Sequence, residues 1–182
     1  MDWGKQVLKT KTVYRVYVDY EKEEQWLNEM AAQGWLLERF KIGRYVFSKG
    51  EPGTYMYRIE LLEELPNHTR SKAYLEFLDE MGIEVVDTSF RWIFLRKRTE
   101  DGPFHLYSDF DSMIAKTNRV LQLYQVVLLV NIIAVCINVI SPFAVWVIWP
   151  NIALAAFIAY LIQRQTQKLR TLKGLREISE QD

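Results

Sequence analysis

The pattern of hydrophobic and polar positions changes character near residue 120. Before that point, short apolar stretches alternate with polar ones, whereas residues 120–163, a run of 44, contain no Asp, Glu, Lys or Arg. A helix that crosses a bilayer needs about 20 apolar residues, so a run of this length holds two spans. A domain of about 100 residues could not cover two helices that are apolar all round, which disfavours a soluble core. The sequence therefore predicts a transmembrane unit behind a domain covering residues 1–107.

Ser141 and Pro142 mark the turn between the two predicted spans, because proline disfavours the continuation of a helix. We expect the spans at about 120–140 and 143–162, paired as a transmembrane helical hairpin. Lysine and arginine flank the run at both ends and are absent from the turn. By the positive-inside rule, the chain then crosses the cell membrane twice and both termini are cytoplasmic.

The segments that flank the spans are candidates for contacts at the membrane surface. Residues 108–119 predict a juxtamembrane helix that continues into the first span, and residues 164–182 predict a basic amphipathic tail. The tail cations are candidate contacts for anionic lipid headgroups. They are Arg164, Lys168, Arg170, Lys173 and Arg176. A continuous helix could transmit a signal between membrane and domain, or it could simply tether the domain.

Asparagines interrupt the apolar run at depths that match across the predicted hairpin. With the turn at residues 141–142, Asn131 in the first span and Asn151 in the second lie at about the same depth. A hydrogen bond between them would stabilise the pair by about 0.6 kcal/mol. The same amides could instead hold two copies of the chain together.

The first 107 residues predict an α+β domain. Alternation, helical spacing and turn residues predict strands at 12–19, 35–49, 54–62 and 83–98 and helices at 20–33 and 69–81. The order strand, helix, strand, strand, helix, strand is that of the ferredoxin-like βαββαβ fold. An offset of 48 residues aligns the two helices and their terminal glycines, Gly34 and Gly82, as expected for two repeated units. We expect a four-stranded antiparallel sheet with both helices on one face and the other face open.

Aromatic residues on the predicted strands are the candidate interaction face. They are Tyr17, Tyr55, Tyr57, Phe90, Trp92 and Phe94. Aromatic side chains on an open sheet also bind RNA in some domains, but residues 1–107 carry 16 Lys plus Arg against 18 Asp plus Glu. Because a net acidic domain repels phosphates, we expect no direct binding of nucleic acid. A hydrophobic ligand, a second copy of the chain or another protein fits these residues better, and of these we favour a protein-protein contact.

The chain offers little that could carry catalysis. Its one cysteine, Cys136, lies in the first predicted span, and its two histidines, His68 and His105, stand apart in predicted loops. Neither a zinc site nor a nucleophile beside a histidine is suggested by this spacing. We therefore predict a protein that is not an enzyme and needs no cofactor.

A family resemblance rests on the stretch from Trp26 to Glu63, WLNEMAAQGWLLERFKIGRYVFSKGEPGTYMYRIELLE. Its tryptophan-bearing helix, Gly-Trp exit and aromatic strands resemble DUF2812, a bacterial family of unknown function. Proteins of this family are often found beside PadR-type transcriptional repressors, so the resemblance implies such a repressor as a candidate partner. It supplies no catalytic residues to carry over. It adds a partner hypothesis and no mechanism.

Together these features predict a membrane-anchored cytoplasmic module for interaction or sensing. We expect a regulatory partner in a transcription-control or envelope-stress system, with the bilayer and a protein as its partners and with self-association as a possibility. The alternative is an accessory subunit of a transporter or envelope complex, in which the spans make the main contacts.

Overall fold

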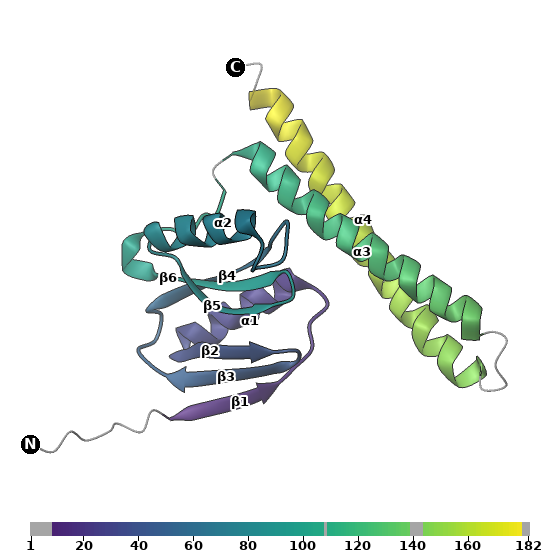
Figure 1. The fold of residues 1–182 in the computed structure, drawn as a ribbon, viewed down its shortest axis with the longest axis horizontal. Coiled ribbons are helices and arrows are strands. Elements are labelled where there is room, and N and C mark those ends of the chain that lie inside the picture. The colour runs from purple at the N-terminus through teal and green to yellow at the C-terminus, as the bar shows by residue number, and fades with distance from the viewer. Residues whose placement is uncertain (1–8, 108, 139–143, 180–182) are drawn as a thin grey trace, which may run out of the picture. The chain divides into compact units, whose positions relative to one another are not determined.

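A computed structural model describes residues 9–107, 109–138 and 144–179 of the chain. It divides into two compact units, Met1–His105 and Leu106–Asp182, which are described separately (Figure 1). The first unit combines strands and helices, and the second is helical. The fold is therefore α+β, as the sequence predicts, but its strand arrangement differs from the prediction.

The first unit consists of two β-α-β-β repeats, each with its own three-stranded antiparallel sheet. The first repeat contains β1 (Thr10–Tyr14), α1 (Tyr20–Ala32), β2 (Trp35–Lys41) and β3 (Arg44–Lys49). The second contains β4 (Tyr55–Leu61), α2 (Thr69–Glu80), β5 (Glu84–Ser89) and β6 (Trp92–Arg98), followed by a 3-10 turn, η1 (Thr99–Asp101). The strand orders β1-β3-β2 and β4-β6-β5 match between repeats. The offset of 48 residues therefore reflects a real structural repeat, although its unit is βαββ and not βαβ.

The predicted four-stranded ferredoxin-like sheet is wrong because each of two long predicted strands is a hairpin. The turns at Ile42-Gly43 and Phe90-Arg91 divide 35–49 and 83–98 into two strands each. A bulge between Leu37 and Arg39 shifts the register in the first hairpin, and the equivalent bulge lies between Val85 and Asp87. Each bulge reverses the alternation of inward and outward side chains, and the two-residue turn reverses it again. The spacing of apolar residues in each hairpin is therefore the same as that of one uninterrupted strand.

The segment Gly50 to Gly53 connects the two repeats. In the expected four-stranded antiparallel sheet, it would have been the turn between the strands at 35–49 and 54–62. Instead, β3 and β4 belong to different sheets, so this segment crosses from the first repeat to the second. Turn chemistry marks a change of direction but does not say which strand pairs next.

The limits of α1 follow the sequence signals closely. The Asp19 side chain caps the helix by accepting a hydrogen bond from the Glu21 amide at 3.1 Å. Gly34 follows the helix with φ of +78°, a conformation that glycine adopts without a Cβ clash. Tyr20, Leu27, Met30 and Ala31 form the buried face of α1.

The two sheets share a core through α1 (Figure 1). This helix packs against β2 of the first sheet and β4 of the second, while α2 packs against β5. At the neighbouring edges of the sheets, the Phe40 amide donates a hydrogen bond to Asp87 Oδ2 at 2.7 Å, and the Phe40 and Phe94 rings lie 4.4 Å apart. Within the described residues, no helix or strand packs on the second face of the first sheet, where Tyr14, Arg39, Lys41 and Arg44 are exposed and Ser48 is buried.

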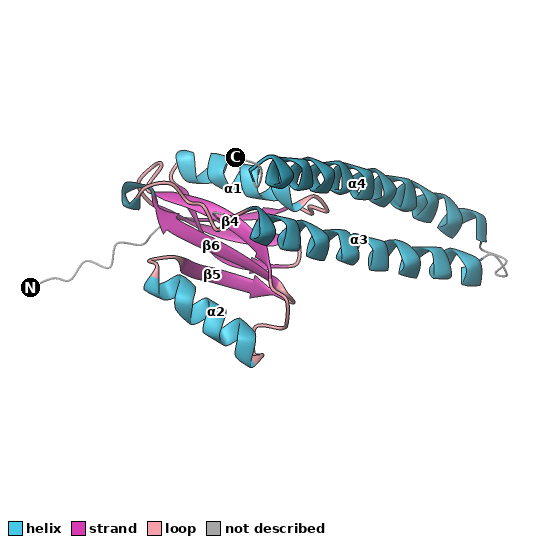
Figure 2. Cartoon of the chain, turned by 90° about the horizontal axis from the view of Figure 1, so that it is seen from above, coloured by secondary structure: helices cyan, strands magenta, loops and turns pink. Residues whose placement is uncertain are grey.

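The second unit is an antiparallel pair of long helices, α3 (Phe110–Asn138) and α4 (Ala144–Ser179), which lie side by side in Figures 1 and 2. An ion pair of 3.2 Å joins Asp111 to Arg176 near the outer ends of the helices. Buried residues on α3, Thr117, Val120, Tyr124 and Asn131, recur every three, four or seven positions, as in a coiled coil. Each helix is therefore longer than a predicted span, because the polar flanks continue the pairing.

Among the described residues, α3 is the one helix long and apolar enough to cross a membrane, judged by length and composition. The predicted hairpin of two short spans at 120–140 and 143–162 is therefore not the observed arrangement. The described part of α4 has Pro150 and Asn151 near its start, and charged residues from Arg164 onward. The predicted turn at Ser141 and Pro142 lies outside the described residues.

Candidate functional site

Four of the six aromatic residues predicted as one interaction face, Tyr55, Tyr57, Trp92 and Phe94, do share a face of the second sheet, but that face is not open. Tyr57 and Phe94 are buried in the core of the first unit, where the Tyr57 hydroxyl accepts a hydrogen bond from the Leu37 amide at 2.9 Å. These two residues are therefore no part of an exposed surface. The predicted open sheet would have exposed them, but the second sheet packs against α1 and β2 instead.

Of the other four aromatics, Tyr17, Tyr55 and Trp92 are partly covered and Phe90 is exposed. The Tyr17 ring contacts Trp26 at 5.6 Å, and the Trp92 ring contacts Tyr20 at 5.4 Å. Tyr55 lies beneath the Arg96 guanidinium at 4.6 Å. Phe90 projects from the β5-β6 turn and is 70% exposed.

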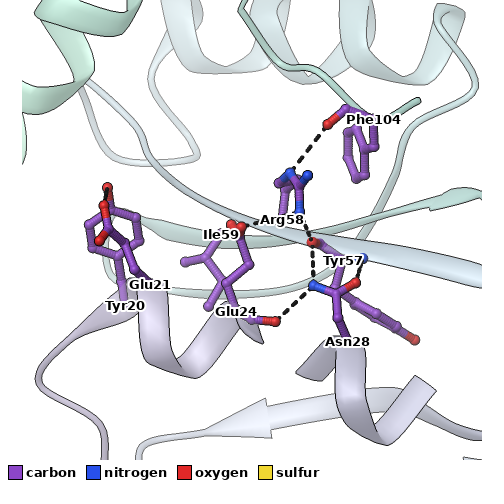
Figure 3. A network of polar contacts seen from close by, with 8 residues as sticks. All are labelled: Tyr20, Glu21, Glu24, Asn28, Tyr57, Arg58, Ile59 and Phe104. Carbon is purple, nitrogen blue, oxygen red and sulfur yellow. Dashed lines mark hydrogen bonds and ion pairs between the residues drawn. The ribbon is translucent and has the colours of Figure 1, made fainter. Parts of the chain in front are cut away.

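Side chains of α1 close the outer edge of β4, as Figure 3 shows. The Asn28 carboxamide accepts a hydrogen bond from the Tyr57 amide at 2.9 Å and donates one to the Tyr57 carbonyl at 3.0 Å. Glu24 accepts from the Ile59 amide at 2.9 Å and pairs with Arg58 at 3.2 Å. A strand edge with satisfied backbone groups cannot accept another strand, so this edge is protected.

Glu23 is a buried carboxyl on the same helix. The Tyr45 hydroxyl donates a hydrogen bond to Glu23 Oε1 at 2.5 Å, and the Tyr45 ring makes an edge contact with the Trp26 ring at 4.8 Å. Burial raises the pKa of Glu23 to about 7, and the hydrogen bond from Tyr45 opposes that rise. Burial and the neighbouring carboxyl also raise the pKa of Tyr45. This pair is held inside the core and is not open to a ligand.

Among the residues that the structure describes, nothing closes the outer edge of the first sheet in this way. The sheets have four edges, of which β4 is closed by α1, and β2 and β5 face each other. Within the described residues, β1 pairs with β3 alone, and four of its five side chains are exposed. An open strand edge offers backbone donors and acceptors to an extended segment.

Cations line the uncovered face beside this open edge. The register places Tyr14 opposite Arg44 and Arg44 opposite Lys41, and it places Thr12 opposite Val46 and Val46 opposite Arg39. Directly opposed residues lie on the same face of a sheet. The exposed outer face of the first sheet, defined by Thr12, Tyr14, Arg39, Lys41 and Arg44, therefore has a net positive charge, although the Glu38 carboxylate accepts a hydrogen bond from Ser48 at its far end.

Sequence reasoning missed this outer face because the hairpin was read as one strand. Arg39, Lys41 and Arg44 lie close to Ile42-Gly43 in the sequence. If this dipeptide had been predicted as a turn, the three cations would have been placed on one surface of a hairpin. Glu24 and Asn28 were missed as well, because their partners on β4 are distant in the sequence.

The predicted polar contact in the second unit is present as a hydrogen bond. Asn131 Nδ2 donates to Asn151 Oδ1 at 2.9 Å, and Asn131 is buried between the helices. The five tail cations all belong to α4, where Arg176 pairs with Asp111. Within the described part of the chain, no group of three histidine, cysteine or acidic side chains could hold a metal ion.

The family described as a protein of unknown function, DUF2812, matches residues 19–129. The chain belongs to this family. The DUF2812 match begins at the Asp19 cap of α1 and ends within α3, so it takes in residues of both units. Strand β1 precedes the matched residues. No curated protein and no solved structure matches the chain.

Proposed function

We propose that this DUF2812 protein is a membrane-anchored docking module that binds a protein partner and catalyses no reaction. The observation that carries the proposal is the open edge of β1 beside a basic, uncovered sheet face, in a chain that also contains a long apolar helix. Binding through this edge would serve a regulatory or sensing role at the membrane.

Support for the anchor comes from the exposed apolar side chains of the helical unit. On α3, large aliphatic residues are half exposed or more, among them Val126, Leu129, Val130 and Ile137. Such a surface is costly in water and favourable in hydrocarbon. We propose that α3 crosses the bilayer and that the apolar part of α4 crosses beside it. The charges that flank the uncharged run then favour a cytoplasmic first unit and two cytoplasmic termini.

Support for docking comes from the chemistry of the β1 edge. A partner segment that adds a strand gains main-chain hydrogen bonds, while side chains on the adjoining face select its sequence. Because Arg39, Lys41 and Arg44 lie on that face, the favoured segment is extended and acidic. A PadR-type regulator, which the family resemblance implies, is one candidate source of this segment.

Photocrosslinking in intact cells tests the docking proposal. A photoreactive amino acid at Thr12 on β1 should capture a protein, and the same residue at Ala73, exposed on α2, serves as the matched control. We expect Arg39→Glu to abolish the adduct at Thr12 because it reverses a charge on the outer face. Equal adducts at both positions, or adducts removed by nuclease, would contradict the proposal.

Replacement of α3 and α4 by an unrelated membrane anchor distinguishes the two readings of the function. Adducts at Thr12 that survive the replacement support docking through the first unit. Their disappearance would favour an accessory subunit, whose partners contact the helices. Resistance of the native chain to alkaline carbonate extraction tests the anchor itself, and release into the supernatant would refute it.

A further inference from the structure

Exposed apolar side chains gather at one end of the first unit, in three separate segments. Val16, in the connection between β1 and α1, is 78% exposed; Ile42, in the β2-β3 turn, is 89% exposed; and Phe90, in the β5-β6 turn, is 70% exposed. Large aliphatic and aromatic residues at this exposure contribute nothing to the core. We refer to these three residues as the apolar tips.

Contacts between the segments bring the tips to the same end. The Arg15 amide donates a hydrogen bond to the Gly43 carbonyl at 2.8 Å, which ties the β1-α1 connection to the first turn. The Tyr20 ring, at the start of α1, contacts the Trp92 ring at 5.4 Å, directly after the second turn. The start of α1 thus links both turns, although their tips are 48 residues apart in the sequence.

Phe90 occupies a backbone conformation that carries a cost. Its φ of +57° is the only positive φ of a non-glycine residue among the described residues. A left-handed conformation costs a bulky residue about 1–2 kcal/mol. Glycine at this position would avoid the strain and the exposure of an aromatic ring to water. An external contact of the Phe90 ring gives a physical reason for an aromatic residue there.

Each tip has a cation beside it in the chain. Arg15 precedes Val16, Lys41 precedes Ile42, and Arg91 follows Phe90. The acidic side chains nearest to the tips in sequence already accept hydrogen bonds: Asp19 from the Glu21 amide, Glu38 from the Ser48 hydroxyl and Asp87 from the Phe40 amide. Apolar side chains that each have a cation next to them in the chain match the layers of an anionic leaflet, with hydrocarbon behind phosphate.

We propose that the apolar tips insert into the headgroup region of an anionic leaflet and hold the first unit against the membrane. The inference rests on the proposed anchoring through α3. The first unit, Met1–His105, is covalently joined to the helical unit that contains the proposed anchor. Tethering to a membrane gives a high effective concentration, and weak contacts then suffice for docking.

A bilayer fits this surface better than a protein does. The tips are separate side chains on turns and on a connecting segment, not a continuous flat patch, and each is next to a cation. Protein interfaces bury a contiguous core from which charged residues are depleted. A fluid leaflet accommodates individual protruding side chains without shape complementarity.

Environment-sensitive fluorescence of the full chain in vesicles tests the proposal. An Ile42→Cys variant, in a Cys136→Ser background, carries a nitrobenzoxadiazole label, and Ala73→Cys on α2 is the matched control position. In vesicles that contain phosphatidylglycerol, we expect a blue shift and quenching by nitroxide lipids at position 42 and neither at position 73. In pure phosphatidylcholine vesicles, the signal at position 42 should fall toward that of the control.

Two variants separate docking from folding. Lys41→Glu removes one cation and adds an acid, so it should lower the docked fraction at least about fivefold, the effect of losing a single interfacial charge. Phe90→Gly relieves the backbone strain and should leave the fold intact or stabilised while it weakens quenching at position 42. Unchanged quenching in both variants would overturn the inference.

Vesicle flotation separates this inference from the proposed function. If the chain floats with vesicles and resists carbonate extraction but the label at position 42 stays in water, the anchor holds and the inference fails. If the chain does not float, the anchor itself fails. Equal quenching at positions 42 and 73 would mean unspecific adsorption and would also overturn the inference, as would a signal that depends on an added protein partner and not on lipid charge.

Discussion

Replacement of Glu23 by glutamine should remove a pH dependence from the stability of the first unit. Burial raises the folded-state pKa of Glu23 from 4.5 to about 7. Between these two values the folded chain binds the proton more tightly than the unfolded chain does, so stability is lost as pH rises. This contribution is fully present below about pH 4.5 and is lost once the pH has passed about 7. A glutamine side chain at this position cannot ionise, and its amide oxygen can still accept the hydrogen bond from Tyr45.

The pKa shift sets the magnitude of this effect. A rise of between two and three pKa units corresponds to about 3 kcal/mol, an upper value because the structure can relax around the ionised group. At pH 8, Glu23→Gln should therefore be more stable than the native chain by up to about 3 kcal/mol. At pH 4.5 the two chains should differ little. Other acidic residues of the chain affect both proteins equally and cancel in the comparison.

Hydrogen exchange measured by mass spectrometry can follow this change within the full chain. Peptides from α1 and β3 report on the region around Glu23 and Tyr45, after correction for the intrinsic pH dependence of exchange. Between pH 5 and pH 8, the protection of these peptides should fall by up to about 100-fold more in the native chain than in the variant. Glu29→Gln, on the exposed side of the same helix, should behave like the native chain. Equal losses of protection in the native chain and in Glu23→Gln would refute the reasoning.

Three further substitutions test other parts of the structure. Gly34→Ala should lower the free energy of unfolding by about 3 kcal/mol, because a Cβ at this position would lie 2.6 Å from the Gly50 carbonyl oxygen. Gly82 has a similar φ but no atom within 4 Å of an added Cβ, so Gly82→Ala should lower the same free energy by about 1 kcal/mol. Chemical denaturation in detergent measures both free energies of unfolding. Equal losses in the two variants would contradict the predicted clash between a Cβ at position 34 and the Gly50 carbonyl. Asn28→Ala should cost about 2 kcal/mol by exposing the β4 edge, with faster exchange of β4 amides as the readout and unchanged exchange as the refuting result. Asn131→Leu should weaken the helix pair by about 0.6 kcal/mol, which a double-mutant cycle with Asn151→Leu isolates; a coupling energy of zero would exclude the contact.

Features set by neighbouring residues were predictable from the sequence. Asp19 and Gly34 delimit α1 because capping and a left-handed residue act within a few positions of the helix end. The contact between Asn131 and Asn151 followed from counting residues on either side of a turn, which needs only the helical rise. Membership of DUF2812 rested on residues in order along one segment.

The candidate site was less predictable, because its parts meet only after the chain has folded. The cations Arg39, Lys41 and Arg44 could be read from the sequence, but their common face depends on a bulge and a turn whose effects on alternation cancel. The burial of Tyr57 and Phe94 depends on how the second sheet packs against α1, which no local pattern encodes.

The sequence by itself determined the long uncharged run, the limits of the first helix and the twofold repetition of the first unit. These are one-dimensional properties, set by composition and by periods of two or 3.6 residues. Only the tertiary structure decided that the repeats form two sheets, that α1 closes the edge of β4, and that β1 pairs on one side alone within the described part of the chain. Strand pairing and edge protection join residues far apart in the chain. Their free energies depend on tertiary packing, which the spacing of hydrophobic residues along the sequence does not indicate.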